Sequence, residues 1–197
     1  MAKQERARRT RQRILDAAAA EFAFEGYAGT TLHRIAERAG MTKGALQGHF
    51  SCKEALAHTV TTDGMDRGLE VLAALGRTST GGDSPMSALI RRVYEDLRLR
   101  AGLELLTDPV LRKDTDPREL TWFHRALVDL LGVAEVEGVD ERARSEEVAH
   151  RLLVTVCGML RVHRAFGHTF GIEVCTDPCL LQLMSLTTDR KGDRTSP

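Results

Sequence analysis

The chain has 197 residues, in which 28 lysine and arginine residues balance 28 aspartate and glutamate residues. This length suits one large or two small domains with a buried core. No stretch approaches the ~18 apolar residues of a membrane span, and the charged start does not fit a secretory signal, so we expect a soluble, cytoplasmic protein.

The balance of charge conceals an uneven distribution. Residues 1–53 contain ten lysine or arginine residues and five acidic residues, a net charge of +5, so the remainder carries −5. A basic segment on an acidic body is typical of a nucleic-acid-binding head. Residues 2–13 have almost no apolar content, and we expect a mobile arm, with a solvated helix end as the alternative. Because such arms follow phosphates or enter the minor groove, Arg6 and Arg9 are candidate DNA contacts.

Two helices are expected directly after this arm. The first runs over residues 10–24 and ends at Gly26. The second carries apolar residues at helical spacing over residues 32–39. Thr30 or Thr31 can cap its start, because a hydroxyl accepts from the free amides of the first turn.

A third, shorter helix follows after a glycine. Gly40 ends the preceding helix, because glycine adopts the left-handed conformation without a Cβ penalty. Thr42 then caps a helix over about residues 43–50. Two helices joined in this way form a helix-turn-helix, which presents its second helix to a DNA major groove. Any two adjacent helices need a turn, so spacing alone leaves a purely structural pair as the alternative.

The rest of the chain predicts more helices and no strands, hence an all-α fold. A long helix behind an N-cap Ser51 runs over residues 53–75 and connects the head to the body. The clearest loop covers residues 76–85. Further helices are expected over 86–106 with a break near Ala101–Gly102, over 119–137, from Ser145 to about 167, and over 177–188, and residues 189–197 are expected to be disordered.

Metal sites and enzyme chemistry are poorly supported. Cys175 and Cys179 follow His163 and His168, but zinc sites usually need tighter cysteine pairs and a closed set of four ligands. We therefore expect no metal, no cofactor, and cysteines that are buried or reduced. The chain has no Gly-x-Ser-x-Gly, no phosphate loop and no paired acid motif, so we do not expect an enzyme.

The motifs of the head resemble those of a known family. They are Ile35-Ala36, Ala39-Gly40, Thr42-Lys43-Gly44, Leu46, His49-Phe50 and Lys53-Glu54. Together they resemble the signature of TetR-type transcriptional repressors. The start MAKQERA-x-RTRQ-x-ILDAAA, the run TKGAL-x-x-HF and RAG at 100–102 further resemble the γ-butyrolactone receptors of filamentous actinobacteria, which repress antibiotic and regulatory genes until an autoregulator binds.

This resemblance implies the domain organisation. Residues 1–52 would form a three-helix helix-turn-helix DNA-binding domain with its basic arm, and residues 53–188 a helical ligand-binding and dimerisation domain. A homodimer would form through helices 145–167 and 177–188, and the apolar content of 177–188 independently suggests a buried surface. Intramolecular core is the alternative for that segment. A two-fold dimer would bind a pseudo-palindromic double-stranded DNA operator.

The resemblance also places residues at the DNA. The amides at the start of helix 43–50 suit a phosphate, Lys43 can reach a phosphate or a guanine edge, and Lys53 would hold a second phosphate. Gln47 stands where the family usually carries tyrosine, and Cys52 where a small polar residue is usual. Gln47 can instead read an adenine edge, so we predict altered or weakened operator affinity. The predicted contacts are Arg6, Arg9, Thr31, Thr42, Lys43, Gly44, Gln47, His49 and Lys53.

In the body, the resemblance implies a ligand pocket shaped by Trp122 and Thr155. An indole covers an apolar ring or chain, and a hydroxyl can donate to a lactone carbonyl. A core tryptophan and a threonine bonded to its own helix are the alternatives. Gly64 stands where these receptors often carry glutamine near the pocket mouth, which leaves another butyrolactone, a butenolide or furan, and an antibiotic precursor open as the effector. A pseudo-receptor for an antibiotic or its precursor, and a ligand-independent DNA-binding protein, are the alternative functions.

Overall fold

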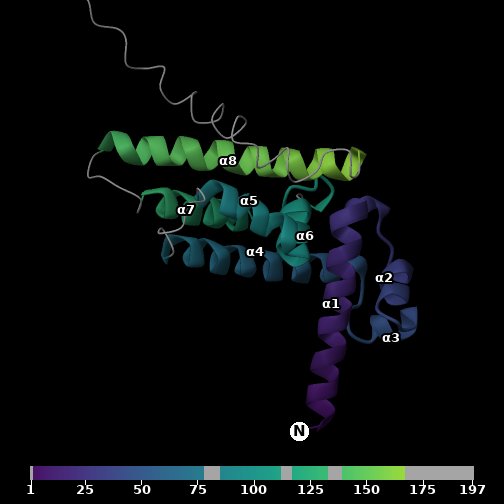
Figure 1. The fold of residues 1–197 in the computed structure, drawn as a ribbon. Coiled ribbons are helices and arrows are strands. Elements are labelled where there is room, and N and C mark those ends of the chain that lie inside the picture. The colour runs from purple at the N-terminus through teal and green to yellow at the C-terminus, as the bar shows by residue number, and fades with distance from the viewer. Residues whose placement is uncertain (1, 78–84, 112–116, 133–138, 167–197) are drawn as a thin grey trace, which may run out of the picture.

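The computed structural model describes residues 2–77, 85–111, 117–132 and 139–166, and within these ranges it contains helices and no strand (Figure 1). This confirms the predicted all-α fold. The predicted helix over 177–188 and the tail over 189–197 lie outside the described residues, as does the side chain of Trp122. The helices are α1 (Ala2–Gly29), α2 (Leu32–Arg38), α3 (Lys43–Gln47), α4 (Lys53–Arg77), α5 (Pro85–Glu95), α6 (Leu97–Leu106), α7 (Pro117–Gly132) and α8 (Val139–Phe166).

The helices form a head and a body. Helices α2 and α3 lie against α1 in the head, and α4, α5, α7 and α8 are layered in the body, with α1 across one end of these layers (Figure 1). Helix α6 packs against both α4 and α1, so it lies where the head meets the body. Among the described residues, none of the helices has the length and apolar content to span a bilayer.

Two hydrophobic clusters follow this division. The cluster of the head contains Ile14, Phe22, Ile35, Leu46, Leu56 and Val60, and it also takes in Ala101 and Leu105 from α6. The cluster of the body includes Leu72, Ile90, Leu99, Phe123, Leu127, Leu152, Val156 and Leu160. Because α6 contributes to both clusters, the two parts are joined by buried apolar surface as well as by the chain of α4.

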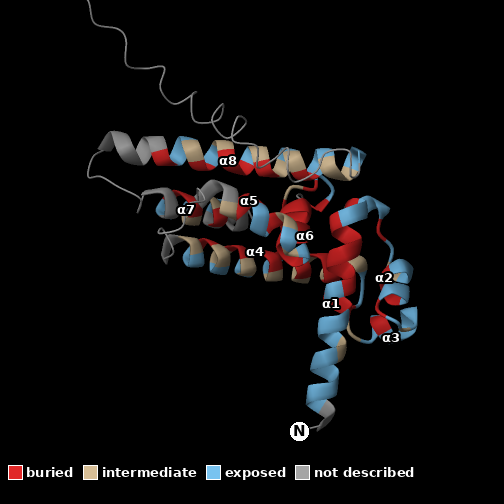
Figure 2. Cartoon of the chain, in the orientation of Figure 1, coloured by how far each residue is buried: buried red, intermediate tan, exposed pale blue. Residues whose placement is uncertain are grey.

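The basic arm predicted for residues 2–13 is wrong, because α1 is helical from Ala2. Its arginine, glutamine, glutamate and alanine residues are all good helix formers, and Arg9 Nε lies 3.4 Å from Glu5 Oε1, one turn away. Figure 2 shows that the amino-terminal half of α1 is exposed, that the following turns, mainly residues 14–23, are buried, and that its carboxyl-terminal end is again largely exposed. Gly26, predicted to end the helix, instead forms a kink with φ 67°, and the helix continues to Gly29.

Three other predicted boundaries also shift. The break in helix 86–106 falls at Asp96, whose carboxylate accepts from the amides of Arg98 (2.9 Å) and Leu99 (3.2 Å) and caps α6. Helix α8 begins at Val139 rather than Ser145, and α3 ends at Gln47 rather than residue 50.

Gly64 and Gly102 meet where α4 crosses α6. A Cβ on Gly64 would lie 2.5 Å from the carbonyl oxygen of Arg98 and 2.8 Å from the Cα of Gly102. The sequence interpretation placed Gly64 near the mouth of a ligand pocket. In the structure it lies at a close backbone crossing instead, which leaves no room for a side chain.

Candidate functional site

The second helix of the helix-turn-helix, α3, presents a polar, accessible surface. Thr42 caps it, with its Oγ1 accepting the amide of Ala45 at 3.2 Å. Leu46 is the buried residue of this helix and anchors it to the head. Four residues predicted at the DNA, Thr42, Lys43, Gly44 and Gln47, are exposed. A Cβ on Gly44 would meet no heavy atom within 4 Å, so a DNA backbone can approach this surface closely.

Side chains from α1 hold α2 in place. The carboxylate of Glu21, 3% exposed, lies between two guanidinium groups, with Nε of Arg38 at 2.7 Å and Nε of Arg34 at 3.0 Å. Arg13 donates to the carbonyl of Ala39 at 2.6 Å, which caps the carboxyl end of α2. These long-range contacts fix α2 on α1, and α2 in turn positions α3.

Thr31 and Gly40 complete this arrangement. Thr31 Oγ1 accepts the amide of Arg34 at 3.3 Å, so Thr31 is the N-cap of α2. Gly40 has φ +65°, the left-handed conformation that the sequence predicts for the end of this helix. The exposed Thr31 thus has a local structural role beside the DNA contact predicted for it.

Lys53 is tied to the end of α1. Its ammonium donates to the carbonyls of Tyr27 (2.8 Å) and Thr30 (2.9 Å) and lies 4.1 Å from the centre of the Tyr27 ring. Burial lowers the pKa of Lys53. Sequence reasoning missed this role, because the contacts span more than twenty residues. The phosphate contact predicted for Lys53 stays a prediction.

The start of α4 is capped by Cys52 rather than by the predicted Ser51. Cys52 Sγ accepts the amide of Ala55 at 3.4 Å, which is the N-cap geometry for a helix that begins at Lys53. The Cys52 side chain is exposed and its thiol is free, which agrees with the expectation of cysteines that are buried or reduced.

The other predicted DNA contacts differ in accessibility. Arg6 and Arg9 are exposed on the amino-terminal half of α1, whereas His49 is half-buried behind α3. Arg11, on the same half of α1, lies 4.4 Å from the centre of the Phe50 ring. The basic charge of the head is therefore partly used to hold its own helices and partly left exposed on α1 and α3.

The body contains a cavity of about 340 Å³ along α7 and α8. The residues that line it are Thr107, Thr121, His124, His150, Leu153, Val154 and Cys157. The rings of His124 and His150 stand edge to face with their centres 6.3 Å apart, and Nε2 of His124 is buried without a hydrogen-bond partner among the described residues. Burial raises the pKa of Cys157 to about 11, so its thiol stays protonated at neutral pH.

The two residues predicted at the ligand lie near this cavity in the chain. Trp122 is next to Thr121 on α7, and its side chain is outside the description. Thr155 is half-buried on α8 and is not among the residues that line the cavity. The two histidines were missed by sequence reasoning. The signal available was helical spacing, since Thr121 and His124 are one turn apart, and His150, Val154 and Cys157 share one face of α8.

Comparison with known proteins identifies the head. Residues 14–60 match the family model "Bacterial regulatory proteins, tetR family". The transcriptional repressor AcnR of Corynebacterium glutamicum is 31% identical over 161 residues, which cover 75% of this chain and 77% of AcnR. The A-factor receptor protein of Streptomyces griseus is 48% identical over 60 residues, 30% of this chain and 22% of the receptor.

Solved structures match a larger part of the chain. A γ-butyrolactone receptor described as ArpA-like has a TM-score of 0.55 and 31% identity, covering 78% of this chain and 82% of the receptor. A protein solved in a study of the control of antibiotic production by bacterial hormones has a TM-score of 0.61 and 28% identity, covering 90% of this chain and 96% of that protein.

Proposed function

Because the chain belongs to the TetR family of bacterial regulatory proteins, DNA-binding regulators, we propose that it represses transcription from a pseudo-palindromic operator as a homodimer in the cytoplasm. The observation that carries this proposal is α3, held from behind by Leu46 and exposed at Thr42, Lys43, Gly44 and Gln47. Its length and accessibility suit insertion into a major groove. The exposed arginines on the amino-terminal half of α1 supply phosphate contacts beside it.

The test of DNA binding begins with a duplex that the purified protein selects from a random library. Lys43→Ala is expected to weaken binding to that duplex by about tenfold or more, because it removes a base-edge or phosphate contact of about 1–3 kcal/mol. Arg125→Ala, at an exposed residue of α7 outside the proposed dimer helices, is the matched control for loss of one positive charge and should bind as the wild type does. Equal binding by both variants would remove α3 from the DNA surface.

Gln47 offers a second test at the same surface. If its amide reads an adenine edge, Gln47→Ala relaxes the preference for one base pair, and Gln47→Tyr exchanges base reading for a phosphate contact. Binding of all single-base-pair variants of the selected duplex measures both effects. An unchanged operator affinity in Gln47→Tyr would contradict the proposal that Gln47 alters recognition.

We propose further that a γ-butyrolactone-like molecule releases the protein from DNA. The relatives described as γ-butyrolactone and A-factor receptors support this ligand class. The cavity along α7 and α8 is a candidate site, because 340 Å³ falls in the range of small-molecule pockets and its wall carries His124 as a polar group. Trp122 and Thr155 remain proposed ligand contacts on the same two helices.

Release is measured by gel shift with synthetic γ-butyrolactones, butenolides and culture extract added separately. Release by a γ-butyrolactone supports the receptor proposal, and release by extract alone favours a pseudo-receptor that answers to an antibiotic or a precursor. If none of them releases the DNA, the protein is a ligand-independent regulator. If one of the compounds does release the DNA, Trp122→Ala should abolish release by that compound while leaving DNA binding intact.

A further inference from the structure

Arg98 of α6 lies at the junction of head and body and contacts two other helices, α1 and α4. It is 7% exposed although it carries a charge. Its Nε donates to Asp16 Oδ1 on α1 at 2.8 Å, and its Nη2 donates to Gln12 Oε1 on α1 at 2.8 Å. Its Nη1 donates to Asp63 on α4 at 3.1 Å. The planar fork of one guanidinium therefore joins α1, α4 and α6.

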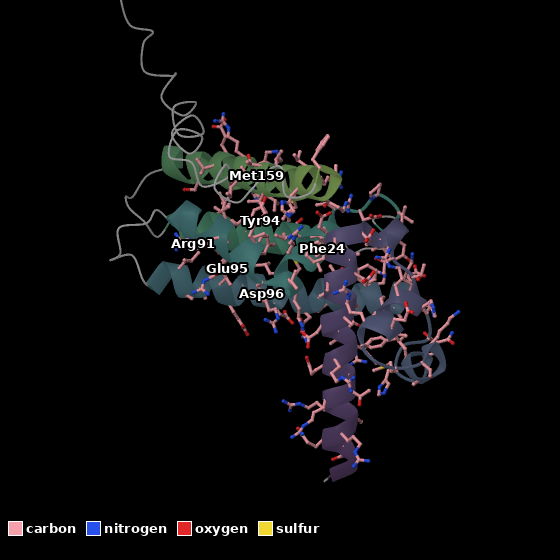
Figure 3. The ribbon with its side chains drawn as sticks, turned by 45° about the vertical axis from the view of Figure 1, so that its right-hand side comes forward. Phe24, Arg91, Tyr94, Glu95, Asp96 and Met159 are labelled. Atoms are coloured by element: carbon pink, nitrogen blue, oxygen red, sulfur yellow. The ribbon has the colours of Figure 1, made fainter. Side chains whose placement is uncertain are left out.

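A second arginine fixes the start of α6 on α4. Arg67 Nη1 lies 2.9 Å from Asp96 Oδ2, and Arg67 Nε lies 3.3 Å from Asp63 Oδ2. Asp96 is the N-cap of α6, labelled in Figure 3. Burial by itself would raise the pKa of Asp96, but hydrogen bonds from the amide of Leu99 and from Arg67 lower it overall. The amino terminus of α6 is thus held on α4 by Arg67. The same arginine also contacts Asp63, which is the α4 partner of Arg98.

The partners of Arg98 are unequally exposed. The side chain of Asp16 on α1 is 67% exposed, whereas that of Asp63 on α4 is 29% exposed. If the contact to α1 is lost, Asp16 is left in water, whereas Asp63 keeps Arg67 as a second guanidinium partner on α4. Arg98, Asp63 and Arg67 therefore form one charged cluster between α6 and α4, and Asp16 joins α1 to this cluster from an exposed position.

We propose that Arg98 is a positioning residue that sets the orientation of α1, and with it α3, relative to α6. The inference rests on the proposed DNA-binding function. Helix α1 carries the contacts that hold α2, so a rotation of α1 moves the whole head. When the contact between Arg98 and Asp16 is formed, the head and α6 move together. Without it, α1 is still held by apolar contacts with α6 and α4 and by the hydrogen bond from Lys53, but no ion pair among the described residues joins it to α6.

The test uses the full-length protein with Asp16→Asn, which removes the charge from the α1 side and leaves Arg98 paired with Asp63. Asp66→Asn, on an exposed residue of α4, is the control for the same change in net charge. In hydrogen exchange, amides of α1 around residues 10–18 should exchange faster in Asp16→Asn than in Asp66→Asn, and amides of α7 and α8 should not differ. Asp16→Glu, which keeps the carboxylate, should restore slow exchange.

Binding to the selected duplex gives the functional readout. Relative to Asp66→Asn, Asp16→Asn should lose about fivefold or more in affinity for the selected duplex, with equal affinity for random DNA. Equal specificity in the two variants overturns the inference, even if exchange is faster, because the contact is then only structural. A wild-type protein that selects no duplex contradicts the proposed function instead. The inference itself fails when the wild-type protein selects a duplex and the two variants bind that duplex with equal specificity.

Discussion

The buried acids of the head and of the body differ in how many guanidinium groups lie within ion-pair distance of them. In the head, Nε of Arg38 lies 2.7 Å from Glu21 Oε1 and Nε of Arg34 lies 3.0 Å from Glu21 Oε2, although Oε2 accepts no hydrogen bond of good geometry among the described residues. In the body, Glu104 of α6 is equally buried, and Arg164 of α8 lies 2.9 Å from its Oε2, but its Oε1 has no hydrogen-bond partner among the described residues. Two nitrogens of the neighbouring Arg100, Nε and Nη2, are likewise buried without one.

The surroundings of Arg100 explain why its charge is costly. Its guanidinium carbon lies 5.1 Å from the centre of the Phe24 ring and 5.8 Å from that of Tyr94, both labelled in Figure 3. Burial lowers the pKa of Arg100 and raises that of Glu104, in spite of the nearby opposite charges. Buried charges without full hydrogen bonding favour any rearrangement that satisfies them. In the described part of the chain, Glu21 thus has two guanidinium groups within ion-pair distance and Glu104 has one, so we expect the head to lose more stability than the body when its buried acid is neutralised.

The largest effect is expected at the close crossing of α4 and α6. Gly64→Ala puts a Cβ 2.5 Å from the Arg98 carbonyl oxygen, and the neighbouring backbone cannot move away cheaply. We expect a loss of up to about 3 kcal/mol in the free energy of unfolding, measured with urea. Thr62→Ala on the exposed side of α4 is the control and should change the free energy of unfolding by less than about 0.5 kcal/mol. A fully stable Gly64→Ala would mean that α4 and α6 do not cross here.

Removing the buried charge of the head comes next. Glu21→Gln leaves Arg34 and Arg38 beside each other without the carboxylate between them, and we expect a loss of about 2 kcal/mol in urea unfolding. Glu37→Gln on the same face of the head, 68% exposed in its side chain, should change stability by less than about 0.5 kcal/mol. Equal effects of the two substitutions would mean that the buried ion pairs of Glu21 contribute no more to stability than the exposed carboxylate of Glu37.

Glu104→Gln in the body should change the stability of the protein in the opposite direction to Glu21→Gln in the head. Because the pKa of Glu104 is raised in the folded protein, its ionised form is less favoured there than in water. Glu104→Gln keeps an acceptor for Arg164, so at pH 7 the variant should be as stable as the wild type or slightly more stable. As pH falls through the raised pKa of Glu104, the folded wild type takes up a proton and gains stability relative to Glu104→Gln.

Thermal unfolding between pH 7 and pH 5 measures that change. The effect of Asp96, whose lowered pKa reduces stability at acid pH, is present in both proteins and cancels in the comparison. Glu70→Gln on the exposed side of α4 should follow the wild type at every pH. If the wild type instead lost stability relative to Glu104→Gln as the pH fell from 7 to 5, the raised pKa of Glu104 would be contradicted.

The helix-turn-helix could be predicted because its signals are local. Thr31 and Thr42 cap helices through hydrogen bonds to amides three residues away, and Gly40 ends a helix through its own φ. Each signal lies within one turn of the residue it affects, so the sequence alone contains it. The polar start of the chain was ambiguous, since the same residues suit an arm and a solvated helix, and here the helix forms.

The charged contacts between helices could not be predicted in the same way. Arg98 and Asp16 are 82 residues apart, and Gly64 meets Gly102 through a crossing of two helices. Which charges pair and which glycines touch depends on how the helices rotate and pack, and a single sequence gives only the apolar face of each helix. The cavity was missed for the same reason, because its wall comes from α6, α7 and α8 together.

The smallest expected effect concerns the joint at Cys52, the N-cap of the helix that leaves the head. A hydroxyl is a stronger acceptor than a thiol, so Cys52→Ser should strengthen the contact with the Ala55 amide, now 3.4 Å from Sγ, and stabilise the protein by about 0.5 kcal/mol in urea unfolding. Cys157→Ser in the body provides the contrast. Its thiol is largely buried and its pKa is raised to about 11, so a hydroxyl there should cost about 1 kcal/mol or more. Stabilisation by both substitutions, or by neither, would show that the capping geometry at Cys52 does not set the result.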